Sequence, residues 1–204
     1  MPGKEEKRMA GSYEITHAVR IGGAEVVLGE DKANDSEPYL CAVYESNGIL
    51  ERYKECMVGD HYAEFVKLFC QRIQERAERI LAEQEKATVP LEPFREADCF
   101  PNDAAKSIEG KIVAVKTEAL APEYRTAPHQ LVYITGGNGA LANTHGNACF
   151  CINLYTGKHT RWERYDIQGE VRPERIPDWA KQRLEEIKRE QKRIARQRRD
   201  KEAR

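Results

Sequence analysis

Short hydrophobic runs, separated by glycine-bearing turns and polar loops, occupy the first third of the chain and are typical of β-strands. Four such runs follow one another, over residues 13–19, 20–29, 39–44 and 49–57. The Gly22-Gly23 pair suits a tight turn between the first two runs. Asn47-Gly48 is a favoured two-residue hairpin turn between the last two, because both residues tolerate positive φ angles. We therefore predict a small antiparallel sheet.

The hydrophobic spacing then lengthens to three and four residues, which predicts a long amphipathic helix. Its apolar stripe comprises Tyr62, Phe65, Val66, Phe69, Ile73, Ala77, Ile80 and Leu81. The positions between them are mainly charged, so the opposite face would meet solvent. Asp60 stands where an N-cap residue would accept hydrogen bonds from the first turn. We expect this helix to pack its stripe on the first sheet.

A segment that contains three prolines, residues 88–101, separates this half from a second set of β-like runs. A short strand is predicted near residues 108–116. Three further runs cover residues 131–135, 148–155 and 160–167. A glycine-rich loop separates the first two, and a four-residue turn that contains Gly157 separates the last two. Because such connections favour antiparallel pairing, we predict a three-stranded meander.

The last predicted helix, residues 179–204, has only a sparse hydrophobic stripe. We expect Trp179 and Leu184 to pack back on the body, and the remainder, which has little apolar surface, to project into solvent. The predicted fold class is therefore α+β. The predicted parts are a disordered leader over residues 1–11, an antiparallel sheet with its long helix over 12–89, a β-meander module over 90–178 and a basic helical tail over 179–204.

The formal net charge of −1 hides an uneven distribution of charge along the chain. From Ala180 to Arg204 there are 11 Lys and Arg residues against 5 Asp and Glu, so this tail carries +6 and the rest of the chain −7. A basic tail suits an anionic partner such as nucleic acid. It is equally consistent with a solvated helix that pairs with the acidic body.

Composition also bears on location and on metal binding. No apolar run approaches the roughly 18 residues of a membrane span, and no signal-peptide pattern opens the chain. We therefore expect a cytoplasmic protein without membrane attachment. The six cysteines show no zinc-finger spacing. We predict reduced thiols, and we predict neither a metal nor a cofactor.

The glycine-rich loop contains Gly-Asn-Gly-Ala-Leu-Ala from Gly137, which matches the G-x-G-x-x-G/A pattern of dinucleotide-binding sites. That motif works only where a helix follows and turns its N-terminus toward the pyrophosphate. A strand is predicted to follow here, so we reject a dinucleotide site. The loop is nevertheless long for a hairpin, and its glycines would allow an anion-binding nest, although an ordered connector explains it equally well. The side chains that could add hydrogen bonds to a ligand are Asn138, Thr144, His145 and Asn147.

Two histidines on either side of the middle run suggest a catalytic alternative. His145 and His159 could act as acid and base in RNA cleavage, where a 2′-hydroxyl loses a proton and a leaving oxygen gains one. They are expected at opposite ends of the strand, and no nucleophile motif accompanies them. No catalytic residue is therefore assigned.

Cations interleave with aromatic residues in the last run of the meander. Alternation along a strand places Trp162 and Arg164 on one face and Arg161 on the other. Such mixtures can hold phosphates and stack bases. The tail adds cations that could contact a phosphate backbone without reading its sequence. The candidate contact residues of this kind are Arg161, Arg164, Arg193, Arg196, Arg198 and Arg199.

The residues from Tyr133 to Trp179 also carry a set of motifs that resembles a known module. The motifs are Val-Tyr-Ile-Thr-Gly-Gly-Asn-Gly, His-Gly-Asn-Ala-Cys-Phe, Asn-Leu-Tyr-Thr-Gly-Lys, Trp-Glu-Arg-Tyr-Asp-Ile and Ile-Pro-Asp-Trp-Ala. They resemble a small module of proteins from conjugative and other mobile elements of Firmicutes. Some members of that wider group are similar to type II-A anti-CRISPR proteins, which inhibit Cas9. The resemblance covers about a quarter of the chain.

This resemblance implies a protein that binds Cas9, or the complex of Cas9 with its guide RNA, and blocks it. It supplies no catalytic residue. Two alternatives stay open at this point. One is an RNA-directed nuclease that acts on guide RNA, and the other is a non-catalytic accessory protein of DNA transfer in a mobile element.

Overall fold

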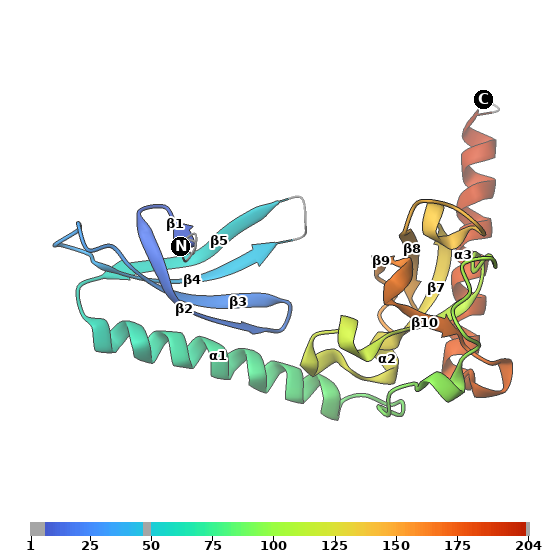
Figure 1. Ribbon diagram of the computed structural model, residues 1–204, viewed down its shortest axis with the longest axis horizontal. Helices are drawn as coiled ribbons and strands as arrows, with labels where there is room; N and C mark the ends of the chain where they lie inside the picture. Colours follow the sequence, from blue (N-terminus) through green and yellow to red (C-terminus); the bar gives the residue numbers. More distant parts are fainter. Residues whose placement is uncertain (1–6, 47–49, 203–204) are drawn as a thin grey trace, which may run out of the picture. The chain divides into compact units, whose positions relative to one another are not determined.

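The computed structural model describes residues 7–46 and 50–202, and the chain folds as two compact units, Met1–Lys86 and Ala87–Arg204. Each unit combines an antiparallel sheet with a long helix (Figure 1), which confirms the predicted α+β class. The units divide between Lys86 and Ala87, slightly before the predicted boundary at residue 90. The predicted Asn47-Gly48 turn and most of the predicted leader lie outside the described residues.

The first unit contains a five-stranded antiparallel sheet in the order β1-β2-β3-β4-β5. Its strands are β1 (Met9–Ala10), β2 (Tyr13–Ile21), β3 (Ala24–Glu30), β4 (Tyr39–Ser46) and β5 (Glu51–Gly59). Strands β2 to β5 confirm the four predicted runs, and Gly22 and Gly23 form the turn between β2 and β3 with φ angles of 64° and 75°. Strand β1 corrects the prediction of a leader that is disordered as far as residue 11.

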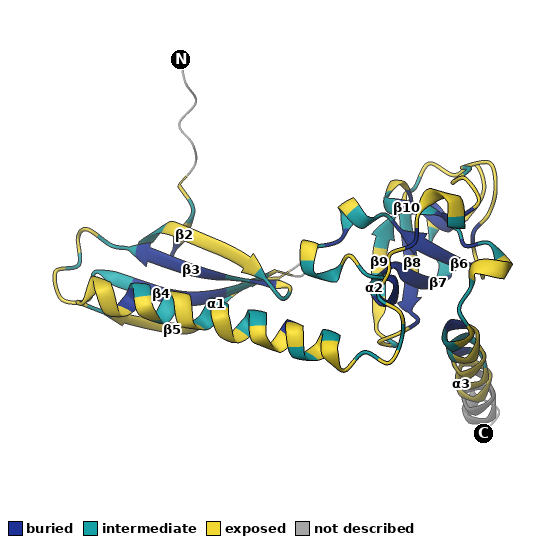
Figure 2. Cartoon of the chain, turned by 90° about the horizontal axis from the view of Figure 1, so that it is seen from below, coloured by how far each residue is buried: buried dark blue, intermediate teal, exposed yellow. Residues whose placement is uncertain are grey.

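Helix α1 (Tyr62–Glu85) lies along one face of this sheet, as its stripe predicted (Figure 1). Phe65 is buried against Val26, Leu28 and Cys41 of β3 and β4. The side of α1 that faces away from the sheet is exposed (Figure 2). The N-cap residue is His61 and not the predicted Asp60, and no side-chain hydrogen bond caps the helix. Packing of the stripe holds the helix on the sheet, together with hydrogen bonds from Arg72 to the carbonyls of Cys41 at 3.1 Å and Glu55 at 2.7 Å.

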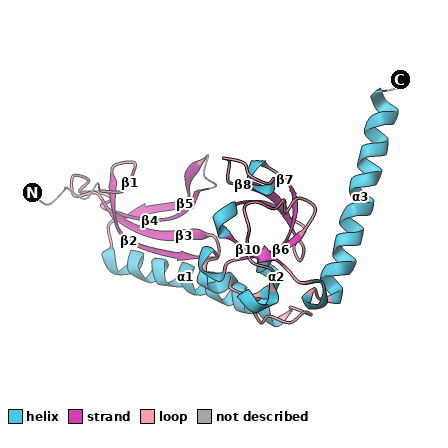
Figure 3. Cartoon of the chain, turned by 45° about the vertical axis from the view of Figure 1, so that its right-hand side comes forward, coloured by secondary structure: helices cyan, strands magenta, loops and turns pink. Residues whose placement is uncertain are grey.

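The second unit also has a five-stranded antiparallel sheet, in the order β10-β6-β7-β8-β9. Its strands are β6 (Ile112–Val115), β7 (Leu131–Gly136), β8 (Ala148–Asn153), β9 (His159–Glu163) and β10 (Ile167–Glu170). The predicted meander is β7-β8-β9, and β6 and β10 extend it on one side (Figure 3). The connections hold α2 (Ala127–Gln130) and the short helical turns η1 (Glu96–Asp98), η2 (Thr117–Ala119), η3 (Pro122–Tyr124), η4 (Asn138–Ala140), η5 (Arg164–Asp166) and η6 (Pro173–Arg175).

Helix α3 (Asp178–Glu202) packs its first half on one face of this sheet. Ala180 and Ile187 are buried there with core residues from the strands, and Trp179 and Leu184 pack beside them as predicted. The start of the predicted tail is thus part of the core of the second unit and not a separate part. The later turns of α3 extend beyond the sheet (Figure 1).

The opposite face of the second sheet is covered by connecting segments instead of a helix. Its buried cluster includes Val113, Val132, Cys149 and Cys151, with Trp162 packed against it. Both cysteines therefore share a face, as the alternation along a strand requires. Burial raises the pKa of Cys151 to about 11, so this thiol stays protonated near neutral pH.

A buried glutamine joins the proline-bearing segment to the second sheet. Gln130 is fully buried, and its Oε1 accepts a hydrogen bond of 2.7 Å from the Phe94 N–H. Its Nε2 donates to the carbonyl oxygens of Val115 at 2.9 Å and Phe94 at 3.2 Å. Because all the hydrogen-bonding atoms of the amide have a partner, its burial is compatible with a stable core.

Candidate nucleic-acid interface

The side chain of Arg164, which was predicted to contact a partner, instead forms a hydrogen bond with the backbone of the glycine-rich loop. Arg164 is only 8% exposed. Its Nε donates to Asn102 Oδ1 at 2.8 Å and its Nη1 to the Gly139 carbonyl at 3.0 Å. Its Nη2 donates to the carbonyls of Asp103 at 2.7 Å and Lys106 at 3.1 Å. Because its donors already have internal partners, Arg164 is a structural anchor and does not offer its charge to a ligand.

The position of Arg164 also corrects the predicted third strand. Strand β9 ends at Glu163, and the chain turns through η5 (Arg164–Asp166). The strict alternation of faces therefore stops at Glu163. Trp162 packs inward, as expected for one face, whereas Tyr165 is 62% exposed on the turn.

The backbone of the loop is largely engaged in internal hydrogen bonds. The N–H groups of Ala140, Leu141 and Asn143 donate to carbonyls of Gly137, Asn138 and Ala104. A Cβ atom at Gly139 would collide with the Asn147 carbonyl, so this glycine permits close packing. These contacts favour the ordered connector over an anion-binding nest at this part of the loop. The loop is followed by β8 and not by a helix, in agreement with the rejection of a dinucleotide site.

The predicted side chains of the loop lie at the surface. Asn138, Thr144, His145 and Asn147 are all exposed. The Thr144 hydroxyl donates a hydrogen bond to the Asn138 carbonyl, so the later part of the loop is joined to its first part. These side chains remain candidates for contact with a partner, without a cavity of their own among the described pockets.

The two histidines of the catalytic alternative do not form a pair. His159 pairs with Ile152 near the end of β8, whereas His145 precedes the start of that strand at Ala148. The six residues of β8 span roughly 17 Å at the rise of an antiparallel strand. An acid and a base must both reach the same reacting group, so this arrangement gives no support to a shared active site.

A more promising surface lies on β8 and β9, where Phe150 and Arg161 are cross-strand partners. Phe150 points to the same side of the sheet as Ile152, which is buried in the cluster under α3. Nevertheless, Phe150 is 52% exposed, and the side chain of Arg161 is 58% exposed. We call Phe150, Arg161 and the exposed His159 the β8–β9 platform.

In the platform, the flat ring of Phe150 on β8 lies beside the guanidinium-bearing residue Arg161 on the neighbouring strand, β9. Residues directly opposite each other on antiparallel strands have Cβ atoms about 5 Å apart. Arg161 forms an ion pair with Glu163, whose side chain is 22% exposed, so a phosphate would have to compete with that carboxylate. An exposed ring beside a guanidinium can stack a base while the cation contacts its backbone.

Sequence reasoning identified Arg161 but missed Phe150. Cys149 and Cys151 are two residues apart, so on a strand they must share one face. If that face is the buried one, Phe150 must point the other way. That other face also carries Ile152, which is buried, so it is the exposure of Phe150 in the structure that marks it as part of a binding surface.

The cations of α3 add positive charge, but their ion pairs stay within the helix in the described part of the chain. Their described ion pairs all join residues three apart on the helix, and they are Lys181–Asp178, Arg183–Glu186, Lys188–Glu185 and Arg193–Glu190. No ion pair among the described side chains joins α3 to another element. The side chains of Arg196, Arg198 and Arg199 lie outside the described part. The described side chains of α3, which end at Ile194, therefore give no support to the alternative in which the tail pairs with the acidic body.

Within residues 7–46 and 50–202, no group of three or more His, Cys, Asp and Glu side chains is placed to hold a metal ion. The same residues contain no helix with both the length and the apolar surface needed to cross a bilayer. Comparison with models of protein families, with curated proteins and with solved structures gives no match to this chain.

Proposed function

We propose that this chain is a non-catalytic anti-CRISPR protein that binds a type II-A Cas9, or Cas9 with its guide RNA, and blocks it. The choice of target rests on the resemblance of residues 133–179 to proteins of mobile elements. Contact with the guide RNA is supported by one observation. Phe150 and Arg161 are cross-strand neighbours, and each exposes more than half of its side chain.

The chemistry of the platform suits unpaired RNA better than a duplex. Bases in a duplex are stacked on each other, whereas unpaired bases can stack on an aromatic side chain. The complex of Cas9 with its guide RNA offers such bases before the target is bound. The exposed cations of α3 would strengthen binding through phosphates, independently of sequence.

The nuclease alternative has no observation in its favour. His145 and His159 lie at opposite ends of β8, and the described residues provide no group that could hold a catalytic metal ion. It nevertheless predicts a different product, so the same experiment can distinguish it from a blocking protein.

The test is a target-cleavage assay with purified Cas9, guide RNA and a labelled target duplex, in the presence of increasing amounts of the full chain. Several type II-A Cas9 proteins should be compared. We expect target cleavage to fall while the guide RNA stays intact on a denaturing gel. Degradation of the guide RNA by the chain alone would favour the nuclease. Full cleavage of the target with every Cas9 would refute the proposal and favour the accessory role in DNA transfer.

Two single variants test the platform within this proposal. Phe150→Ala should weaken binding of the guide RNA roughly tenfold, because stacking of one base contributes about 1–3 kcal/mol. Tyr165→Ala is the matched control, since Tyr165 is also an exposed aromatic residue but lies on η5 outside the platform. Arg161→Ala should reduce the slope of binding against salt by about 1 if Arg161 contacts one phosphate. Equal effects of Phe150→Ala and Tyr165→Ala would exclude the platform as the RNA contact.

The tail needs a truncation that leaves the core intact. Removal of the whole of α3 would remove the buried Ala180 and Ile187 and destabilise the second unit. A chain that ends at Ile194 keeps both and loses the arginines at 196, 198 and 199. We expect weaker binding of guide RNA and a shallower salt dependence, with the same response to Phe150→Ala. An unchanged salt slope would exclude the terminal arginines from RNA contact.

A further inference from the structure

A cleft of about 580 Å³ lies at the β10 edge of the second sheet, away from the β8–β9 platform. Its walls come from the segment around η1, from the end of β6 with η2, and from β10. This volume is within the range of small-molecule sites, and it can accept one nucleoside. The side chains with the chemistry to recognise such a ligand are Phe100, Gln168, Arg95 and Lys116.

The wall that carries Phe100 is fixed to the sheet by several contacts. The Phe100 N–H donates to the Glu170 carbonyl at 2.8 Å, and the preceding residue, Cys99, forms a β-bridge with Val171. Arg172 does not line the cleft, but its guanidinium lies over the Phe100 ring, 4.6 Å from the centroid. Phe100 is still 42% exposed. The ring is therefore positioned before any ligand arrives, with part of its surface available to the cleft.

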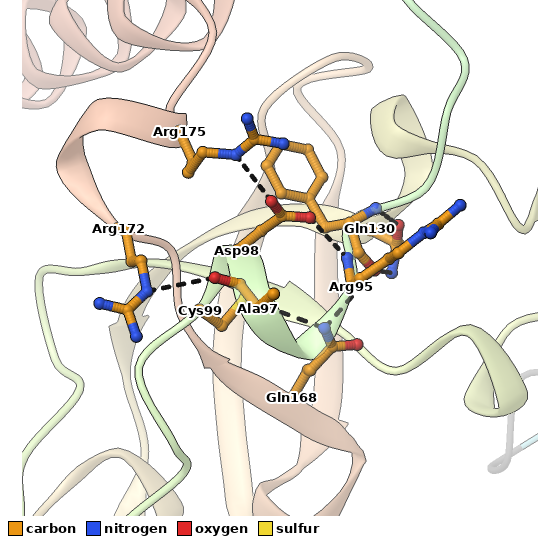
Figure 4. A network of polar contacts seen from close by, with 9 residues as sticks. Arg95, Ala97, Asp98, Cys99, Gln130, Gln168, Arg172 and Arg175 are labelled. Atoms are coloured by element: carbon orange, nitrogen blue, oxygen red, sulfur yellow. Dashed lines mark hydrogen bonds and ion pairs between the residues drawn. The ribbon is translucent and has the colours of Figure 1, made fainter.

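Ion pairs and hydrogen bonds also hold η1 in place beside the cleft (Figure 4). The Nε atom of Arg175 lies 2.6 Å from Asp98 Oδ1, and Asp98 Oδ2 accepts a bond of 2.8 Å from the Arg95 N–H. The Nε atom of Arg172 donates to the Ala97 carbonyl at 3.2 Å. Asp98, Arg172 and Arg175 are not among the residues that line the cleft, so these contacts hold the wall without occupying the cleft.

Gln168 presents a hydrogen-bond acceptor that has no partner among the described residues. Its Nε2 lies 3.5 Å from the Phe94 carbonyl and 4.0 Å from Cys99 Sγ. Its Oε1 points away from these groups (Figure 4), and the residue lines the cleft. A reversed amide would place Oε1 against the Phe94 carbonyl, so the local groups favour the orientation that leaves an acceptor free.

The charges around the cleft nearly balance. Arg95 and Lys116 line it together with Glu96 and Glu118. Neither cation forms an ion pair within the described part of the chain. Because the four charges sum to zero, the cleft does not resemble a site for several phosphates. An uncharged, flat ligand with a hydrogen-bond donor matches it better.

We propose that this cleft binds a nucleobase that carries an exocyclic amino group, as adenine does. The base would lie against Phe100, and its amino group would donate to Gln168 Oε1. This inference rests on the proposed function, since an RNA-binding protein would use the cleft for one unpaired base. The cleft and the platform lie at opposite edges of the sheet, so variants at one site need not disturb the other.

The test is a titration of the full chain with adenosine and, separately, with inosine, followed by NMR. Inosine has a carbonyl oxygen where adenosine has its amino group, so it would place one acceptor opposite another. We expect adenosine to bind at least roughly tenfold more tightly than inosine, as the loss of one well-placed hydrogen bond implies. Equal affinity for the two nucleosides, or no saturable binding of adenosine, would overturn the proposal.

Variants identify the groups responsible. Gln168→Ala should abolish the preference for adenosine, because it removes the acceptor for the amino group. Phe100→Leu should weaken the binding of both nucleosides. Phe150→Ala, at the platform, should leave the binding of both unchanged. A preference that persists in Gln168→Ala would refute the assigned acceptor. Tryptophan fluorescence checks that each variant is folded, since Trp162 and Trp179 both lie in the second unit.

Failure of this proposal can be told apart from failure of the proposed function. If guide RNA binds but adenosine does not, only the assignment of the cleft is wrong. If adenosine binds with the expected preference but Cas9 is not inhibited, the cleft is a nucleobase site in a protein with another role.

Discussion

Replacement of Arg164 by alanine should destabilise the second unit by about 3–6 kcal/mol, because four hydrogen bonds from one charged group are lost. The bond to the Gly139 carbonyl is buried, and a bond of this kind contributes about 1.5–3 kcal/mol. The bonds to Asn102, Asp103 and Lys106 are partly buried. Their acceptors can recover some hydration, so we assign them about 0.5–1 kcal/mol each.

Urea unfolding of the full chain, followed by tryptophan fluorescence, measures this effect without interference from the first unit. The chain has two tryptophans, Trp162 and Trp179, and they pack on opposite faces of the second sheet. A loss of about 4 kcal/mol would lower the urea midpoint by roughly 2 M, for slopes of about 1–3 kcal/mol per M. Arg164→Lys should be intermediate, because an ammonium group cannot reach all four acceptors in the geometry of a guanidinium.

Arg161→Ala is the matched control for this experiment. Arg161 lies three residues earlier, and its ion pair with Glu163 is partly exposed, so its loss should cost no more than about 1 kcal/mol. If Arg164→Ala unfolds at the same urea concentration as Arg161→Ala, the anchoring role of Arg164 is wrong. The loop and the segment around residues 102–106 would then be held by other contacts.

Three further predictions use the same fluorescence measurement. Gln130→Leu should cost about 2–4 kcal/mol, because it leaves the buried Phe94 N–H without its partner and removes the hydrogen bonds to the Phe94 and Val115 carbonyls; an unchanged midpoint would contradict this role. Gly139→Ala should cost about 1–3 kcal/mol by forcing the loop away from Asn147, and wild-type stability would exclude the collision. Burial raises the pKa of the Cys99 and Cys151 thiols from 9.0 to about 11. The folded state therefore favours the protonated thiols, and their contribution to the free energy of unfolding is complete below about pH 9 and is lost as the pH rises through 11. Cys151→Ala should therefore show a shallower fall in midpoint over that range, and an equally steep fall would exclude the thiol as a cause.

The long helix and the main strands could be predicted because their buried side chains recur at regular intervals along the chain. The stripe from Tyr62 to Leu81 has the spacing of one helix face, and it packs on a sheet as expected. The runs at β7, β8 and β9 were found in the same way. By contrast, β10 is a short strand whose partner, β6, lies more than fifty residues earlier. Local patterns carry little information about such a pairing.

Arg164 shows why the candidate site was predicted less well than the fold. In the sequence it continues the alternation of Trp162, and a charged residue in such a run is expected at the surface. Arg164 is buried because Asn102, which lies 62 residues away, and the carbonyls of Asp103 and Lys106 accept its hydrogen bonds. No spacing rule connects these groups. The motif Trp-Glu-Arg-Tyr-Asp-Ile therefore contains a structural anchor, Arg164, and the contact candidate Arg161 directly precedes the motif.

The internal role of Arg164 changes where a partner of this protein should be sought. If the glycine-rich loop were the ligand site, its backbone donors would be directed outward, but those of Ala140, Leu141 and Asn143 are bonded within the unit. The loop instead buries the guanidinium of Arg164, which joins the loop to η5. The side chains left open on the same sheet are Phe150 and Arg161. A nucleic-acid partner is thus expected to contact the strands of the meander more than the loop between them, and mutations in the loop should act mainly through stability.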